Sequence, residues 1–170
     1  MNKPAFVAII AVSVATADQL NKVWLRAALA RHDSIDVVPG LFSIVHACNP
    51  GGAFSFLAGA NEGWRLPFFF IASTLAIVML FYFLRQVHEK QRVLQFALAG
   101  ILGGAIGNLI DRAWFGCVTD FLEVYWGRYH WPAFNVADSF ISIGVVILFA
   151  HSLFVREEQD PGESRAETSR

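Results

Sequence analysis

The chain has 170 residues, of which 55% are hydrophobic, 14% aromatic and only 16% charged, a composition that is unusual for a soluble domain. It predicts a membrane protein with a single domain. The net charge of −1, without a long acidic or basic run, gives no reason to expect nucleic acid as a partner and argues against that class.

Four apolar runs predict transmembrane helices. A bilayer core about 30 Å thick requires roughly 20 mainly apolar residues in a helix, and the longest uncharged runs have about that length. We expect an all-α membrane protein with four transmembrane helices and a small extramembrane β-element on the periplasmic side. The helices are expected at about residues 4–28, 65–84, 93–112 and 132–155.

The first apolar run has two interpretations. One interpretation is a cleavable signal peptide, because Lys3 is followed by an apolar stretch and then by Ala15-Thr16-Ala17, a small-x-small cleavage pattern. The apolar pattern continues beyond this point, however, and favours a retained helix. Asp18 and Lys22 lie four residues apart on one face of it, either as a simple ion pair at the membrane edge or as part of a functional site.

The segment 33–60 differs from its apolar neighbours. Two short β-prone runs are separated by Pro39-Gly40, which predicts strands joined by a turn and hence the extramembrane β-element. The element leads into Asn49-Pro50-Gly51-Gly52. Small residues let the backbone approach a ligand closely, and Asn49 offers a donor and an acceptor, but the local sequence alone favours a plain turn.

Charge predicts the orientation in the membrane. The second helix is almost entirely apolar and carries no chemistry. The basic link 85–92 is expected in the cytoplasm by the positive-inside rule, together with both termini. A single membrane-embedded domain would span residues 1–155, and the charged tail 156–170 is expected to be a disordered cytoplasmic segment.

The third and fourth helices hold most of the buried polar candidates. Four glycines between Gly100 and Gly107 predict close helix packing. Asn108, Asp111 and Arg112 follow on neighbouring positions and predict an internal polar cluster. In the fourth helix, spacings of three and four place Asn135, Asp138 and Ser142 on one inward stripe.

The connection between these helices, residues 113–131, is expected to be an outer loop whose aromatic residues anchor it at the membrane interface. The cysteines, Cys48 and Cys117, have neither zinc-site spacing nor the density of a disulfide scaffold. They are expected to be small apolar residues. A bridge between them is the alternative, because both lie near motifs on the same side of the membrane.

Asp120 and Asp138 suggest aspartic peptidase chemistry. Two neighbouring carboxylates cannot both ionise cheaply, so the pair shares a proton. One carboxylate can then deprotonate a water while the protonated partner donates to the developing oxyanion, and no metal or other cofactor is required. Spacing alone does not show that the two side chains meet, and each could instead cap or bond the backbone.

Four motifs in order closely resemble the lipoprotein signal peptidases, the bacterial type II signal peptidases, from about residue 16 to residue 141. They are Asp18-Gln19 with Lys22, Asn49-x-Gly51-x-Ala53-Phe54-Ser55, Gly103 to Arg112 with Gly116 and Asp120-Phe121, and Phe134-Asn135-x-Ala137-Asp138. The departures are small: Asn21 stands where the family more often has serine or threonine, and Gly52 where alanine is common.

The resemblance implies a four-helix inner-membrane aspartic peptidase that removes signal peptides from prolipoproteins, cutting before a cysteine that carries diacylglycerol. It implies Asp120 and Asp138 as the catalytic dyad. It also implies a monomer in contact with membrane lipid, with its active site toward the periplasm. The residues implied to line or support the site are Asn49, Asn108, Arg112, Asn135, Asp18 and Lys22.

Other functions fit parts of the sequence. Intramembrane Asp, Asn and Arg also occur in small ion-coupled carriers or channel subunits, but no internal repeat is visible. A serine and lysine peptidase would use Lys22 as base for a serine such as Ser55. A metallopeptidase is disfavoured because the five histidines form no His-Glu-x-x-His pair.

Overall fold

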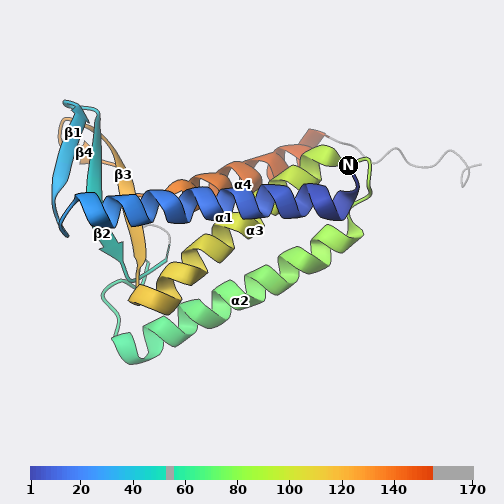
Figure 1. Ribbon diagram of the computed structural model, residues 1–170, viewed down its shortest axis with the longest axis horizontal. Helices are drawn as coiled ribbons and strands as arrows, with labels where there is room; N and C mark the ends of the chain where they lie inside the picture. Colours follow the sequence, from blue (N-terminus) through green and yellow to red (C-terminus); the bar gives the residue numbers. More distant parts are fainter. Residues whose placement is uncertain (53–55, 155–170) are drawn as a thin grey trace, which may run out of the picture.

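The computed structural model describes residues 1–52 and 56–154. The expected tail at 156–170 lies outside the described residues. Four helices are long and apolar enough to cross a membrane, which confirms the predicted fold class (Figure 1). Their bounds are α1 Lys3–Ala28, α2 Glu62–Gln86, α3 Arg92–Phe115 and α4 Val136–Phe154.

Helix α3 forms the centre of the bundle, because the other three helices all pack against it. Its glycines permit two neighbouring helices to approach closely, one on each of two faces. A Cβ atom on Gly103 would lie 2.5 Å from the carbonyl oxygen of Ala11 in α1, and one on Gly104 would lie 2.5 Å from that of Ala137 in α4. The predicted packing role of the glycines is therefore confirmed at both positions.

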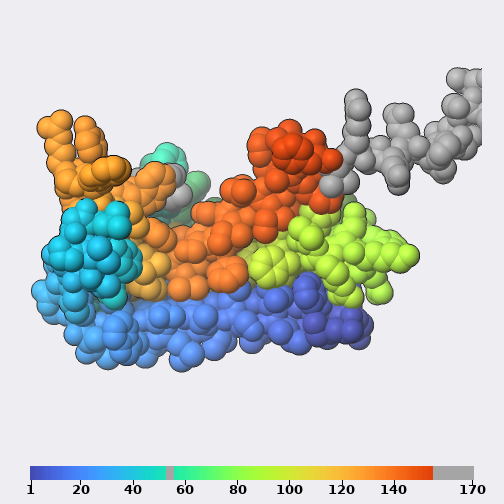
Figure 2. All heavy atoms as spheres, turned by 90° about the horizontal axis from the view of Figure 1, so that it is seen from above, coloured from blue at the N-terminus to red at the C-terminus, as the bar shows by residue number. Residues whose placement is uncertain are grey.

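Helix α1 runs along the whole length of the bundle (Figure 2). Its buried residues recur at intervals of three and four and so form one stripe, as expected for a helix with one packed face. This stripe carries Asp18 and Lys22 into the interior at the height where α3 has Gly107. The buried residues are Ala11, Val14, Asp18, Lys22 and Leu25.

A four-stranded antiparallel sheet in the order β1-β2-β3-β4 lies at one end of the bundle. The N-terminus and the link between α2 and α3 lie at the opposite end (Figure 1). The sheet confirms the predicted β-element. Its strands are β1 Ser34–Val38, β2 Phe42–Asn49, β3 Val118–Trp126 and β4 Tyr129–His130.

Half of the sheet comes from the segment 113–131 that we expected to be a loop. β3 pairs with β2 along its length, so its hydrogen bonds go to a strand far away in the sequence. Phe134 also pairs with Leu122 of β3. This pairing keeps the backbone extended up to Phe134, and α4 therefore begins at Val136 rather than near Pro132.

The two cysteines are paired, whereas the sequence favoured unpaired small apolar residues. Cys48 at the end of β2 and Cys117 just before β3 form a disulfide, with their Cα atoms 5.6 Å apart. The pairing of β2 with β3 explains this, because it brings segments 69 residues apart in sequence into adjacent strands. The alternative interpretation of the cysteines is the one observed.

Candidate active site

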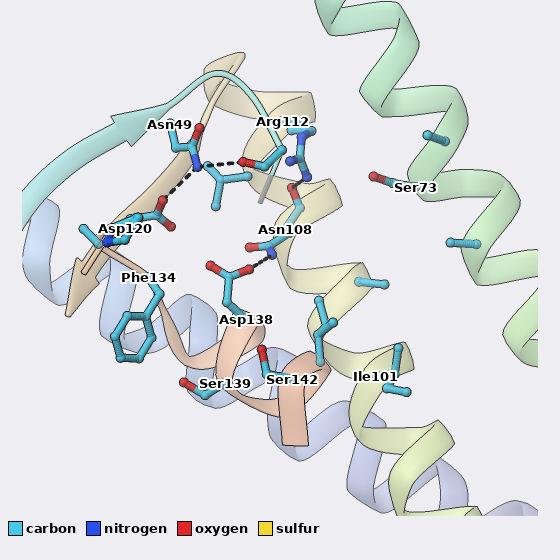
Figure 3. A pocket seen from close by; sticks show the side chains of 18 of the residues that line it. Asn49, Ser73, Ile101, Asn108, Arg112, Asp120, Phe134, Asp138, Ser139 and Ser142 are labelled. Atoms are coloured by element: carbon cyan, nitrogen blue, oxygen red, sulfur yellow. Dashed lines mark hydrogen bonds between the residues drawn. The ribbon is translucent and has the colours of Figure 1, made fainter. Parts of the chain in front are cut away.

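Asp120 and Asp138 come from different elements and line one cavity (Figure 3). Asp120 is the third residue of β3 and is 2% exposed. Asp138 lies in the first turn of α4. The cavity, of about 700 Å³, lies between α2, α3, α4 and the adjoining ends of β2 and β3. The fold therefore brings together the two carboxylates that the sequence separates.

Two asparagines connect these carboxylates. The Nδ2 of Asn135 donates to Oδ1 of Asp120 at 2.7 Å, and the Nδ2 of Asn108 donates to Oδ1 of Asp138 at 2.8 Å. Asn135 also donates to Oδ1 of Asn108 at 3.3 Å, and it accepts the backbone N–H of Asp138 at 2.8 Å. The network orients both acids from the side of the helices.

Asn49 approaches Asp120 from the other side. Its Nδ2 donates to Oδ2 of Asp120 at 3.1 Å and to the carbonyl oxygen of Gly52 at 3.3 Å. Its Oδ1 accepts the N–H of Gly51 at 3.0 Å, so the same side chain also shapes the turn after β2. Both oxygens of Asp120 thus accept an amide hydrogen bond. The rest of the predicted second motif, residues 53–55 with Ser55, lies outside the described residues.

Arg112 lies on the cavity wall, near the end of α3. One of its terminal nitrogens donates to the carbonyl oxygen of Gly51 at 3.0 Å, and the guanidinium lies 5.2 Å from the centre of the Phe69 ring. Its buried Nε has no hydrogen-bond partner within residues 1–52 and 56–154. The planar group therefore braces the turn after β2.

Asp18 and Lys22 do not line the cavity but lie directly behind it. Lys22 contacts Oδ2 of Asp18 at 2.7 Å, Oδ2 of Asp111 at 3.1 Å and Oδ1 of Asn108 at 3.0 Å, which uses all three of its N–H groups. Because an ammonium can only donate, the oxygen of Asn108 must face Lys22. Its amide nitrogen then faces Asp138.

Asp18 and Lys22 are thus an ion pair, but one that supports the site. The second oxygen of Asp18 accepts the N–H of Ala137 at 3.0 Å, which fixes the first turn of α4 beside Asp138. Both side chains are fully buried. Lys22 is committed to its three partners, which leaves it unsuited to serve as the base of a serine peptidase.

Two supporting residues were missed from the sequence. Asp111, noted only as part of a polar cluster, accepts the N–H of Thr119 at 2.8 Å, immediately before Asp120. Arg26 donates to the Thr119 hydroxyl at 2.9 Å and lies 3.4 Å from Asp111. Arg26 follows Lys22 by four residues, so an extension of the polar face of α1 is the signal that would have indicated it.

Electrostatics distinguish Asp120 from a surface carboxylate. Burial, and after it the negative charge of Asp138, raises the pKa of Asp120 to about 7. The hydrogen bonds from Asn49 and Asn135 and the charge of Lys22 act in the opposite direction. Asp120 is therefore poised to change its protonation state near neutral pH, as a general base requires.

The pKa of Asp120 predicts a pH-dependent stability. From about pH 4 to about pH 7 the folded chain keeps a proton that an unfolded Asp120, with a pKa of 3.8, has released. The folded state therefore loses stability as pH rises through this window, by up to roughly 1.4 kcal/mol per pH unit. Asp120→Asn should lack this contribution. Thermal melting from pH 4 to pH 8 should give a shallower decline for the variant, and parallel curves would contradict the prediction.

No group of three or more His, Cys, Asp or Glu that could hold a metal ion occurs within the two described segments, 1–52 and 56–154. The polar groups that line the cavity include carboxylates, amides, one guanidinium and serine hydroxyls, supplied by Asp120, Asp138, Asn49, Asn108, Arg112, Ser73, Ser139 and Ser142. Such a set suits proton transfer and hydrogen bonding to a polar bond held between the helices.

Known proteins with similar sequences and structures show the family of this chain. The family described as signal peptidase (SPase) II matches residues 10–154. A lipoprotein signal peptidase of Desulforapulum autotrophicum is 46% identical over 156 residues, covering 91% of this chain and 96% of that protein. One of Syntrophotalea carbinolica is 49% identical over 140 residues, covering 82% and 86%.

A solved structure, described as a bacterial membrane enzyme, superposes with a TM-score of 0.80 at 30% identity and covers 91% of this chain and 92% of its own. Its likeness extends over the helices and the sheet together. The sequence matches span the first apolar helix to the last, and all four polar motifs lie within them. The chain therefore belongs to the signal peptidase II family, a family of membrane-spanning peptidases.

Proposed function

We propose that this chain is an aspartic endopeptidase that removes the signal peptide from diacylglyceryl-modified prolipoproteins, cutting before the lipid-modified cysteine. The observation that carries the proposal is the pair Asp120 and Asp138, linked through Asn108 and Asn135 at the polar end of a cavity between apolar helices. The relatives named lipoprotein signal peptidases support the choice of substrate.

In the proposed reaction Asp120 is the general base. Both of its oxygens accept amide hydrogen bonds, an arrangement that suits the ionised form. Asp138 also lines the cavity, so its carboxyl group can hold the shared proton and deliver it to a bound substrate. Asp120 takes a proton from water as the water oxygen bonds to the scissile carbonyl carbon, and Asp138 protonates the carbonyl oxygen.

The diol intermediate then collapses. The carbon–nitrogen bond breaks, the leaving nitrogen takes the proton from Asp120, and one hydroxyl of the intermediate returns its proton to Asp138. The products are a carboxylic acid and an amine, and both acids recover their starting states. The bridging amides of Asn108 and Asn135 hold the two carboxyl groups in place throughout, so little reorganisation accompanies the transfer of charge.

The apolar part of the cavity suits a lipid-modified substrate. Ala72, Ala76 and Leu80 of α2 face Ile101 and Ala105 of α3 across it. A substrate whose diacylglyceryl group stays in the bilayer could place its acyl chains along these walls while the scissile bond reaches the polar end. One chain supplies both acids and the cavity, so we propose a monomer as the active form.

We further propose that the sheet lies on the periplasmic side of a bacterial inner membrane and that both termini are cytoplasmic. The opposite end of the bundle carries Lys3 and the basic link 85–92, as the positive-inside rule requires. The disulfide at the sheet end suits an oxidising compartment.

This orientation predicts which introduced cysteines are accessible. A thiol reagent that does not cross the membrane should label Arg128→Cys in intact cells but not His88→Cys. The reverse pattern would show the opposite orientation.

The decisive experiment for the function uses purified protein with a diacylglyceryl-modified prolipoprotein and, separately, with its unmodified precursor. We expect release of the signal peptide from the modified substrate only, followed on a gel. The rate should rise as pH increases through about 7, since Asp120 must be ionised to act as base. No cleavage of the modified substrate would refute the proposed function.

Arg112 gives a prediction for the cavity wall. If its planar fork is required, Arg112→Lys keeps the charge but loses the geometry, and cleavage should fall by about 10- to 100-fold, the range for a hydrogen bond to a charged group. Arg112→Ala should fall at least as far. Both variants are assayed together, with folding checked by thermal melting in detergent. A wild-type rate for the lysine variant would show that only the charge matters.

A further inference from the structure

We propose that the Cys48–Cys117 disulfide is a positioning element of the active site, which holds Asn49 against Asp120 and makes cleavage depend on its oxidation. The inference rests on the proposed peptidase function and concerns a covalent link that the catalytic chemistry does not itself use. It is carried by where the bond lies: one residue before Asn49 on one strand and three residues before Asp120 on the other.

The two sides of the bond are held unequally. On the Cys117 side, α3 ends at Phe115 and Gly116 turns the chain with a φ of 71°. Cys117 is 3% exposed, and Thr119 is fixed by Asp111 of α3 through its backbone N–H. Cys117 is therefore attached to the central helix of the bundle. The bond extends that rigidity to the neighbouring strand.

On the Cys48 side, the end of strand β2 beyond Val45 pairs with β3 but no longer with β1. Its register against β3 is interrupted between Ile44 and Ala47, and Asn49 is the last residue paired. Pro50 follows and has no N–H with which to continue the ladder. Strand ends open at lower free energy than strand centres. Asn49 thus occupies a position that would fray without a further link.

Asn49 is also the residue on which the adjoining turn depends. It donates to Asp120 and Gly52 and accepts from Gly51, whose carbonyl oxygen in turn accepts from Arg112. Loosening the end of β2 would therefore release one of the two amide donors of Asp120. It would also release the contact of Arg112 with the turn.

Reduction by dithiothreitol makes the link switchable in an experiment. The reagent transfers two electrons and two protons to the disulfide, giving the thiols of Cys48 and Cys117, and is itself oxidised to its cyclic disulfide. Alkylation of thiols followed by mass spectrometry reports the state of the bond. We expect no alkylation of the untreated protein and two alkylated cysteines after reduction.

Cleavage of the diacylglyceryl-modified prolipoprotein should fall by about tenfold on reduction, the size expected for one hydrogen bond to a charged acceptor. The rising limb of the pH–rate profile should move to higher pH, because the hydrogen bond from Asn49 lowers the pKa of Asp120. The other charged groups that act on Asp120 are Asp138, Lys22 and Arg112. Asp138 and Lys22 are held by contacts that reduction leaves intact, and any movement of the Arg112 cation away from Asp120 would raise the pKa of Asp120 as well.

The control that isolates Asn49 is a double comparison. Asn49→Ala should lower the rate to a similar extent, and reduction of this variant should then have no further effect. The double variant Cys48→Ala with Cys117→Ala should cleave at the rate of the reduced wild type, and dithiothreitol should not change its rate. Should this pair of substitutions impair folding in a thermal melt, the comparison rests on reduction of the folded wild type and of Asn49→Ala.

Three results would overturn the inference while leaving the peptidase function intact. They are cysteines that alkylate without reductant, a cleavage rate and pH profile that do not change on reduction, and an equal fold-loss in wild type and Asn49→Ala. An equal fold-loss in both proteins would mean that the disulfide stabilises the whole fold and does not act through Asn49. Failure of the oxidised wild type to cleave the modified substrate would instead refute the proposed function.

Discussion

Asp120→Asn and Asp138→Asn are each expected to lower cleavage by about 10²- to 10⁴-fold, the usual contribution of a positioned acid or base. Asparagine preserves the shape of the side chain but can neither accept the proton from water nor supply one to the carbonyl oxygen. Each variant should remain folded and membrane-inserted. The measurement is signal-peptide release from the modified prolipoprotein, with wild type assayed beside it.

A control substitution outside the cavity distinguishes loss of a catalytic carboxylate from loss of one negative charge. Asp33 is exposed beside the sheet, so Asp33→Asn removes one carboxylate in the same way without touching the cavity. It should cleave at the wild-type rate. Thermal melting in detergent verifies folding for all three variants. Near-normal activity in either Asp120→Asn or Asp138→Asn would remove the dyad from the proposed mechanism.

The transmembrane part of the fold could be predicted from the sequence because hydrocarbon imposes a length and a composition. Each spanning helix must satisfy its own backbone and expose apolar side chains, so the signal is local and strong. The glycines at Gly103 and Gly104 could be assigned to packing for the same reason. Contacts with specific partner helices, such as that between Gly104 and Ala137, needed the structure.

The sheet could be predicted only in part. The strands before Asn49 show β-prone runs with a turn between them, but β3 depends on pairing with β2 across most of the chain. In a single sequence its aromatic residues looked like interfacial anchors. Trp126 in β3 and Tyr129 in β4 are 83% and 71% exposed, so the anchoring role stays a prediction, whereas the expected loop missed the two strands that carry these residues.

The candidate site was found through residue types that are expensive beside lipid, and their partners explain why they are tolerated. Asn108 and Asn135 could be suggested by spacing within the predicted helices 93–112 and 132–155. Their link between two acids could not, since it joins α3, β3 and α4. The disulfide was underestimated because two cysteines carry no pattern until the strands are paired.

Lys22 shows most sharply how the interior supports the site. It is fully buried and holds Asp18 and Asp111, while Arg26 provides a second cation for Asp111 but not for Asp18. Removing Lys22 therefore leaves the charge of Asp18 uncompensated inside the bundle. Breaking a buried ion pair by deleting one partner costs about 3–5 kcal/mol, because the remaining charge stays buried without compensation.

Lys22→Met, which keeps the apolar length of the side chain, should accordingly lower the melting temperature in detergent more than the removal of a surface charge. Lys90→Met is the matched control, since Lys90 is exposed in the link between α2 and α3, and it should stay within about 0.5 kcal/mol of wild type. The same loss of stability in both variants would contradict the role of Lys22.

A second substitution tests the cause. Lys22→Met with Asp18→Asn removes the uncompensated charge while leaving an oxygen that can still accept the N–H of Ala137, so much of the lost stability should return. Cleavage should not return fully with it, because the oxygen of Asn108 then keeps only the longer hydrogen bond from Asn135, which holds its amide less firmly toward Asp138. Stability restored without full activity would identify Lys22 as a positioning residue. Recovery of both stability and cleavage would show that Lys22 only neutralises the charge of Asp18.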